Sequence, residues 1–165
     1  MNFYLKLLNT AFWQEAALDS LFVWLTDEPS HVAKSMASPM GIQQLQVVME
    51  ATNNQSFTNM MSPLDKIIFS SLPVNRALGR IDELAGCSPF IRALVKRLQH
   101  PDALVRKFLL TMLTNIYQKH QAPKQLVVLH NLEPLLQDLE QKDPAILVRK
   151  LASELYRSIT THDIL

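Results

Sequence analysis

The chain has 165 residues, which suits a single domain with a sizeable core, and its three glycines leave little room for tight β-turns. Its one cysteine excludes an internal disulfide framework and the usual cysteine-rich zinc sites, so a reducing compartment such as the cytoplasm fits best. The formal net charge of +1 divides into −3 over residues 1–86 and +4 over residues 87–165, which favours either an acidic partner for the second half or basic ridges that face only water.

Residues 2–8 form an apolar stretch that is too short and too interrupted to span a membrane, and it lacks the basic leader and cleavage site of a signal peptide. We expect a helix here, and no membrane partner. The apolar face of this helix has no preceding repeat to cover it. Its residues Phe3, Tyr4, Leu7 and Leu8 are therefore candidates for contact with a second copy of the chain or with a neighbouring repeat.

The rest of the first half shows apolar residues at spacings of three and four, which predict helices over residues 10–26 and 41–51. A short helix at 31–34 and a polar loop at 52–56 are also expected. Five of the seven methionines fall within residues 35–64. Flexible methionines serve either a protein interface that can repack or the filling of gaps between helices, and we favour gap filling.

The second half shows the same helical spacing, and several of its predicted helices begin at a proline. Ser88 is the expected N-cap of one of them, with Pro89 at its first helical position. No stretch alternates apolar and polar residues as a strand would, so the predicted fold class is all-α. The predicted helices are 63–72, 74–85, 88–99, 101–118, 123–129, 132–141 and 144–159.

A repeat is the most informative feature of the sequence. Five of the seven residues of Pro101–Lys107 recur at an offset of 43 in Pro144–Lys150. The predicted core positions recur with them, which pairs Leu104 with Leu147, Val105 with Val148, Phe108 with Leu151, Met112 with Leu155 and Ile116 with Ile159. A period near forty residues is typical of the armadillo/HEAT class, whose units stack into a right-handed helical solenoid. We therefore expect one repeat domain over residues 1–165, with clear units at about 88–130 and 131–165 and degenerate units at about 10–87.

Arg106 and Arg149 occupy equivalent positions in the two clear copies. Such an arginine can hold the register of the stack by pairing with an acid or a helix C-terminal carbonyl of the neighbouring repeat, and we favour this role. The candidate acids are Asp102, Asp138 and Asp143.

Six segments of the chain go beyond a generic repeat, namely His100–Arg106, Ile116–Tyr117, Pro123–Val128, Trp13–Asp19, Val23–Leu25 and Thr161–Leu165. In these segments the chain resembles the C-terminal armadillo-like region of the septation-initiation class of protein kinases, a fungal group similar to the plant epsilon class of MAP kinase kinase kinases. The resemblance implies that the kinase domain lies elsewhere, N-terminal to this region. It also implies recruitment to the spindle pole body by an active Ras-like small GTPase that drives mitotic exit and septation.

The sequence shows no chemistry of its own. It contains no Gly-rich phosphate loop, no His-Arg-Asp and no Asp-Phe-Gly, so we expect neither an enzyme nor a cofactor. The five histidines are scattered and none has metal-ligand spacing. His100 and His130 stand at predicted helix boundaries, where ring nitrogens meet free backbone groups. Nucleic-acid binding ranks low because no aromatic residues are interleaved with the basic ones.

The expected function is that of a non-catalytic interaction module that docks by a preformed surface. Its candidate partner-binding residues are Lys96, Arg97, Lys119 and Lys124, which suit an acidic peptide or the acidic face of a GTPase. The alternative is a dimerisation or scaffold module of a larger signalling protein.

Overall fold

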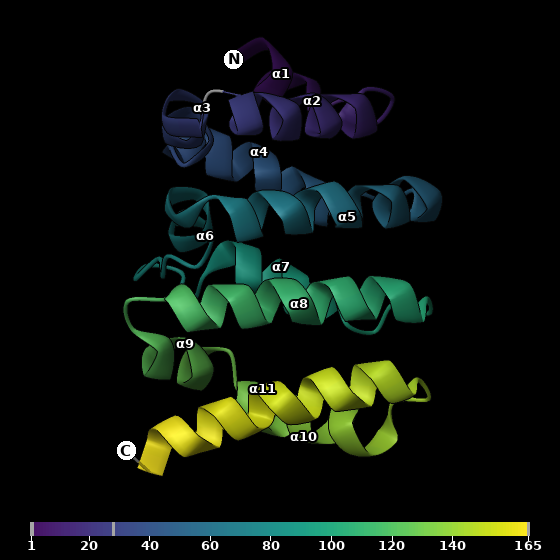
Figure 1. The fold of residues 1–165 in the computed structure, drawn as a ribbon, viewed down its shortest axis with the longest axis vertical. Helices are drawn as coiled ribbons and strands as arrows, with labels where there is room; N and C mark the ends of the chain where they lie inside the picture. Colours follow the sequence, from purple (N-terminus) through teal and green to yellow (C-terminus); the bar gives the residue numbers. More distant parts are fainter. Residues whose placement is uncertain (1, 28, 165) are drawn as a thin grey trace.

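The computed structural model describes residues 2–27 and 29–164, with side chains for residues 3–27 and 30–161. Across these residues the chain forms eleven α-helices and no strand, which confirms the predicted all-α class. The helices follow one another along the long axis, and the two termini lie at opposite ends of it (Figure 1). The helices are α1 (Asn2–Leu7), α2 (Gln14–Asp27), α3 (Pro29–Met36), α4 (Pro39–Met49), α5 (Asn54–Ser70), α6 (Leu72–Leu78), α7 (Pro89–Arg97), α8 (Ala103–Lys119), α9 (Pro123–Leu129), α10 (Leu132–Lys142) and α11 (Ile146–Ile164).

The helices recur in groups of three. Each group has a short helix, an intermediate helix and a long helix, as in α3, α4 and α5 with 8, 11 and 17 residues. The groups α6 to α8 and α9 to α11 repeat this order. The long helices form one continuous row, because α2 contacts α5, α5 contacts α8 and α8 contacts α11 (Figure 1). Behind this row, α4 contacts α7 and α3 contacts α6.

Three contacts join helices at separations close to the sequence period. Arg76 Nε donates to the carbonyl of Lys119, 43 residues away, at 3.2 Å. The ring of His120 contacts the carbonyl of Gly79, 41 residues away, at 2.8 Å. These two contacts hold the end of α6 against the end of α8 within one group. The backbone N–H of Ser88 donates to His130 Nε2, 42 residues away, at 3.0 Å, and so joins that group to the next one.

The core runs through all the groups as one cluster of buried residues. In α8 the buried stripe includes Val105, Leu109, Met112 and Ile116, and each buried side chain of this size contributes roughly 1.5–3 kcal/mol. The prediction that Leu104 and Leu147 belong to this core was wrong, since their side chains are 47% and 49% exposed. Each residue of a helix turns by about 100°, which puts Leu104 nearly opposite the centre of the buried stripe.

Two predicted boundaries in the first half of the chain were also wrong. Helix α5 begins at Asn54, where a loop was predicted, and it continues through Pro63, where a new helix was predicted. The Asn53 side chain caps it by accepting from Ser56 N–H at 2.9 Å. Six buried residues at helical spacing extend on both sides of Pro63, and their burial outweighs the roughly 3 kcal/mol that a proline costs inside a helix.

Helix α6 ends at Leu78, seven residues before the predicted end. Asp82 Oδ1 accepts from the N–H groups of Leu84 and Ala85, at 2.9 and 3.4 Å, and so turns the chain away from helix. Gly86 follows with a φ of 68°, a conformation that glycine adopts easily.

The methionine-rich segment belongs to the core. Met36, Met49, Met60 and Met61 are fully buried, while Met40 is 37% exposed. This burial confirms the prediction that most of these methionines fill space between helices.

Among the described residues, no helix combines the length and the apolar character that a membrane crossing requires.

Candidate partner-binding groove

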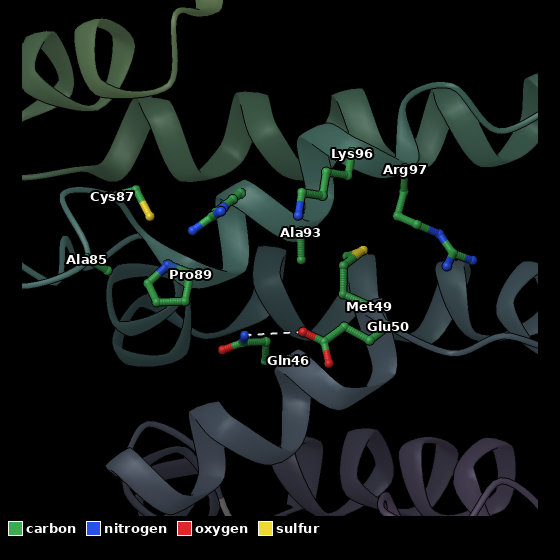
Figure 2. A pocket seen from close by; sticks show the side chains of 10 residues that line it. Gln46, Met49, Glu50, Ala85, Cys87, Pro89, Ala93, Lys96 and Arg97 are labelled. Atoms are coloured by element: carbon green, nitrogen blue, oxygen red, sulfur yellow. Dashed lines mark hydrogen bonds between the residues drawn. The ribbon is translucent and has the colours of Figure 1, made fainter.

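A hollow of about 500 Å³ lies between α4 and α7. We call it the α4–α7 groove. Figure 2 shows Lys96 and Arg97 of α7 on one side of it, and Gln46 of α4 with Glu50, the residue that follows α4, on the other. Met49 and Ala93 line the space between them.

The local sequence of α7 explains why its basic side chains face outward. Ser88 caps the helix, because its Oγ accepts from Ile91 N–H at 3.3 Å and donates to the carbonyl of Leu78 at 2.8 Å. The N-cap predicted at this residue is therefore confirmed. Phe90, Ile91 and Leu94 are buried on the opposite side of the helix. Arg92 and Lys96, four residues apart, consequently share the exposed face, and both line the groove.

The groove has an excess of positive charge. Arg92, Lys96 and Arg97 line it together with one carboxylate, that of Glu50. Glu50 accepts a hydrogen bond from Gln46 Nε2 at 3.4 Å, and no described cation forms an ion pair with it. Three cations against one carboxylate favour a partner whose contact surface is acidic.

Arg97 is held in place by packing. Its guanidinium carbon lies 3.7 Å from the ring centroid of Phe57, a residue that is fully buried. Burial lowers the pKa of Arg97, but a guanidinium keeps its charge at neutral pH. The position of Arg97 is thus fixed by packing, whereas Arg92 and Lys96 are exposed.

The four cations predicted to bind a partner are not brought together. Arg97 lies just before α8, and Lys119 is the last residue of that 17-residue helix, which spans about 25 Å. Lys124 follows in the first turn of α9. Lys96 and Arg97 therefore line the α4–α7 groove, while Lys119 and Lys124 lie at the far end of α8. The prediction also missed Arg92, although its spacing of four from Lys96 was visible in the sequence.

Arg106 is buried and makes four hydrogen bonds. Its Nε and Nη2 donate to the two carboxylate oxygens of Asp143, at 2.8 and 3.0 Å. Its Nη1 donates to the carbonyls of His100 and Pro101, at 2.8 and 3.0 Å. Arg149 Nη1 donates to the carbonyl of Asp143 at 2.7 Å. These contacts join the start of α8 to the segment between α10 and α11.

Of the three candidate acids, only Asp143 pairs with either arginine among the described contacts. Asp102 instead caps α8 by accepting from Leu104 N–H at 2.8 Å, and Asp138 pairs with Lys142 at 2.9 Å. Burial alone would raise the pKa of Asp143. The hydrogen bonds from Arg106 and Ala145 N–H, together with the two arginine charges, outweigh burial and lower that pKa.

Gln14 occupies the same structural position as these arginines. The buried residues that follow Gln14, namely Ala17, Leu18 and Leu21, have the same spacing as the buried residues Leu109, Leu110 and Leu113 that follow Arg106. Gln14 Nε2 donates to the carbonyl of Leu8 at 2.8 Å, six residues earlier in the chain. Arg106 and Arg149 also bond a carbonyl six residues earlier. Three of the four long helices thus carry, near their start, a side chain that donates to the carbonyl six residues earlier. Only the two arginines could be recognised from the repeat in the sequence.

The four apolar residues predicted at a dimer or repeat contact separate into two environments. Leu8 is fully buried within the chain, and Leu7 and Tyr4 are partly buried, with the Tyr4 ring 4.8 Å from that of Trp24. Phe3 is 68% exposed.

The histidines at helix boundaries act as hydrogen-bond acceptors for the backbone, as predicted. His100 Nδ1 accepts from Asp102 N–H at 3.1 Å, and His130 Nε2 accepts from Ser88 N–H. Within the residues whose side chains are described, which do not include His162, no group of three potential metal ligands comes together. Cys87 is a free thiol and only 8% exposed.

Comparison with known proteins relates the chain to signalling kinases. It is 32% identical over 173 residues to MAP3K epsilon protein kinase 2 of Arabidopsis thaliana and 30% identical over 168 residues to cytokinesis protein sepH of Emericella nidulans. These alignments cover 100% and 99% of the chain but only 12% of each relative. No family model and no solved structure matches the sequence. The chain thus corresponds to a small region of much longer proteins, which confirms the resemblance at this level.

Proposed function

We propose that this chain is a non-catalytic interaction and targeting region of a septation or mitotic-exit signalling kinase, and that it docks an active Ras-like small GTPase. The observation that carries the proposal is the α4–α7 groove, where Arg92, Lys96 and Arg97 face a single carboxylate. The similarity to kinases and to a cytokinesis protein supports the signalling context. By resemblance, docking would bring the kinase from the cytoplasm to the spindle pole body.

We further propose that the groups of three helices are armadillo/HEAT-like repeats of a right-handed solenoid. The recurring order of short, intermediate and long helices supports this proposal, as does the hydrogen bond from Ser88 N–H to His130, which joins two neighbouring groups. A solenoid presents a preformed surface, so binding needs little reorganisation of the chain.

The mechanism of docking is charge-complementary contact. Exposed cations such as Arg92 and Lys96 attract an acidic surface during encounter and fix its orientation, while the apolar floor of Met49 and Ala93 excludes water on contact. Association should therefore weaken as ionic strength rises, because salt screens the charges that face solvent.

The test is calorimetric titration of the chain with Ras-like GTPases of its source organism, each loaded with GDP or with a non-hydrolysable GTP analogue. An effector must bind the GTP-loaded form more tightly, and we expect a difference of about tenfold or more. Equal affinity for the two nucleotide states would overturn the effector proposal.

The location of the site is tested with Arg92→Gln combined with Lys96→Gln. We expect this pair to weaken binding of the GTP-loaded form by about tenfold. The matched control is Lys150→Gln with Arg157→Gln, which removes the same charge from exposed positions of α11 and should leave the affinity unchanged. If both pairs weaken binding equally, the effect belongs to net charge and the groove is not the site.

A second function, self-association as a dimerisation or scaffold module, is favoured by aromatic residues at the N-terminal end. Phe12 is 81% exposed, Phe3 68% and Trp13 48%, and the rings of Phe12 and Trp13 pack edge-on at 4.8 Å. Sedimentation at increasing concentration tests this alternative. A dimer that Phe3→Ser and Phe12→Ser abolish would support it, and a strict monomer at high concentration would exclude it.

A further inference from the structure

A second hollow, of about 450 Å³, shares no lining residue with the α4–α7 groove. It is formed by α6, the loop that follows α6, and the turn between α8 and α9. We call it the edge pocket. Its volume is in the range of pockets that hold a small ligand or a single side chain of a partner.

Two guanidinium groups line the edge pocket. Arg76 is anchored through Nε, which donates to the carbonyl of Lys119 at 3.2 Å. Its two terminal nitrogens make no hydrogen bond with any described residue, and neither does the side chain of Arg80. One arginine is therefore held in a fixed position while its remaining donors stay unused, and the second is free to close on a ligand.

The ring of His120, which also lines the pocket, is held in place by two contacts. Its Nδ1 accepts from Ala122 N–H at 2.9 Å, so the proton sits on Nε2, which donates to the carbonyl of Gly79 at 2.8 Å. His120 therefore acts as a rigid wall of the pocket. Glu83 is the one carboxylate that lines it. Lys119 and Lys124, both exposed, lie beside lining residues in the chain and add positive charge to this edge.

We propose that the edge pocket binds an oxyanion, either the phosphate or the carboxylate group of a side chain on a partner peptide. Guanidinium groups match both anions with paired, parallel hydrogen bonds, which an ammonium group cannot provide. The anion would contact the terminal nitrogens of Arg76 and Arg80. This proposal does not depend on the GTPase proposal. Lys119 and Lys124 would contribute to the edge pocket, whereas Lys96 and Arg97 line the α4–α7 groove.

The test follows the arginine side-chain N–H signals of the isotope-labelled chain by NMR at pH 7. Inorganic phosphate is added first, with sodium chloride at matched ionic strength as the reference. We expect the Nε–H signals of Arg76 and Arg80 to shift with a saturable curve in phosphate but not in chloride. Arg80→Gln should weaken this binding at least threefold, and it breaks no side-chain hydrogen bond or ion pair among the described residues.

Arg76→Gln serves as the second variant, and Arg92→Gln in the α4–α7 groove is the matched control that should leave phosphate binding unchanged. The two sources are then compared with N-acetyl-phosphoserine amide and N-acetyl-aspartate amide. Tighter binding of the first assigns the site to a phosphopeptide, and tighter binding of the second to an acidic peptide. Shifts that match those in chloride, or binding that survives both arginine variants, would overturn the proposal. Since Arg92 is the control here and the test residue for GTPase docking, failure of one proposal is distinguishable from failure of the other.

Discussion

Arg106 contributes a buried ion pair, with Asp143, to the contact between the last two helical groups. Its side chain is 9% exposed and that of Asp143 3%, so replacing Arg106 leaves a buried carboxylate without its ion partner. We expect Arg106→Met to reduce the free energy of unfolding by about 3–5 kcal/mol, measured by urea denaturation. The exposed pair Lys142–Asp138, with side chains 74% and 56% exposed, supplies the control. Lys142→Met should cost at most about 0.5 kcal/mol. Similar losses in the two variants would contradict the proposed register role of Arg106.

Ionisation of Asp65 makes the stability of the fold depend on pH. Burial raises its pKa to about 6, against a weaker opposing effect of the Lys107 charge, and its buried Oδ1 has no hydrogen-bond partner among the described residues. The folded state therefore binds this proton more tightly than the unfolded state, whose carboxyl has the ordinary pKa of 3.8. Ionised Asp65 thus destabilises the fold, and this effect appears as the pH rises from about 4 through 6.

Asp65→Asn should consequently stabilise the chain at pH 7.5 and have little effect at pH 4. The side chain retains some contact with water, so we expect a gain of about 1–2 kcal/mol at the higher pH. Urea denaturation of both proteins between pH 4 and pH 8 measures the difference. A constant difference across this range would show that Asp65 does not titrate as its environment requires.

The residues differ in how far their roles could be predicted from sequence. Arg106 was identified because it recurs as Arg149 in the second clear repeat, and Asp143 was one of three acids named as its possible partner. Gln14 was not, because a neutral amide at an aligned position in a degenerate repeat resembles any exposed polar residue. Arg76 and Arg80 were missed for another reason. Their proximity to His120 depends on the packing of α6 against α8, which no spacing within the chain reveals.

At the scale of helices, the joint between α6 and α8 depends on the absence of a side chain at Gly79. A Cβ there would lie 2.7 Å from Ile116 Cγ2 and 2.9 Å from His120 Cδ2. Gly79→Ala should therefore cost about 1–3 kcal/mol and shift the NMR signals of the His120 ring. Gly86→Ala is the contrasting variant, since no atom lies within 4 Å of its Cβ and only its positive φ opposes the change. Unchanged His120 signals in Gly79→Ala would mean that the joint tolerates the methyl group.

Helix positions were predicted well where capping and periodicity agreed, as at Ser88 and Pro89 of α7. They were predicted poorly where local and tertiary signals conflicted. Pro63 is a local stop signal, yet α5 passes through it because α2 and α8 pack on both sides of that helix. The end of α6 was predicted too late, because the Asp82 carboxylate accepts from the N–H groups of Leu84 and Ala85 and forms a turn that a helical pattern alone does not reveal.

At the scale of the whole molecule, the continuous core predicts a single cooperative unfolding transition. Both tryptophans, Trp13 and Trp24, lie at the N-terminal end, whereas helical circular dichroism reports on all groups. The two signals should therefore give coincident denaturation curves. Curves that separate would show that the helical groups unfold independently, as weakly coupled repeats do.

The 43-residue period allowed the succession of helical groups to be predicted, but not the α4–α7 groove, which exists only where side chains of two groups face each other.

Hydrogen exchange of the chain, alone and with the GTPase in each nucleotide state, tests the central proposal most directly because it reports site and state together. We predict slower exchange in α4 and α7 with the GTP-loaded form, and no change with the GDP-loaded form at the same concentration. Equal protection by both forms, or protection confined to α1 and α2, would contradict docking of an active GTPase in the α4–α7 groove.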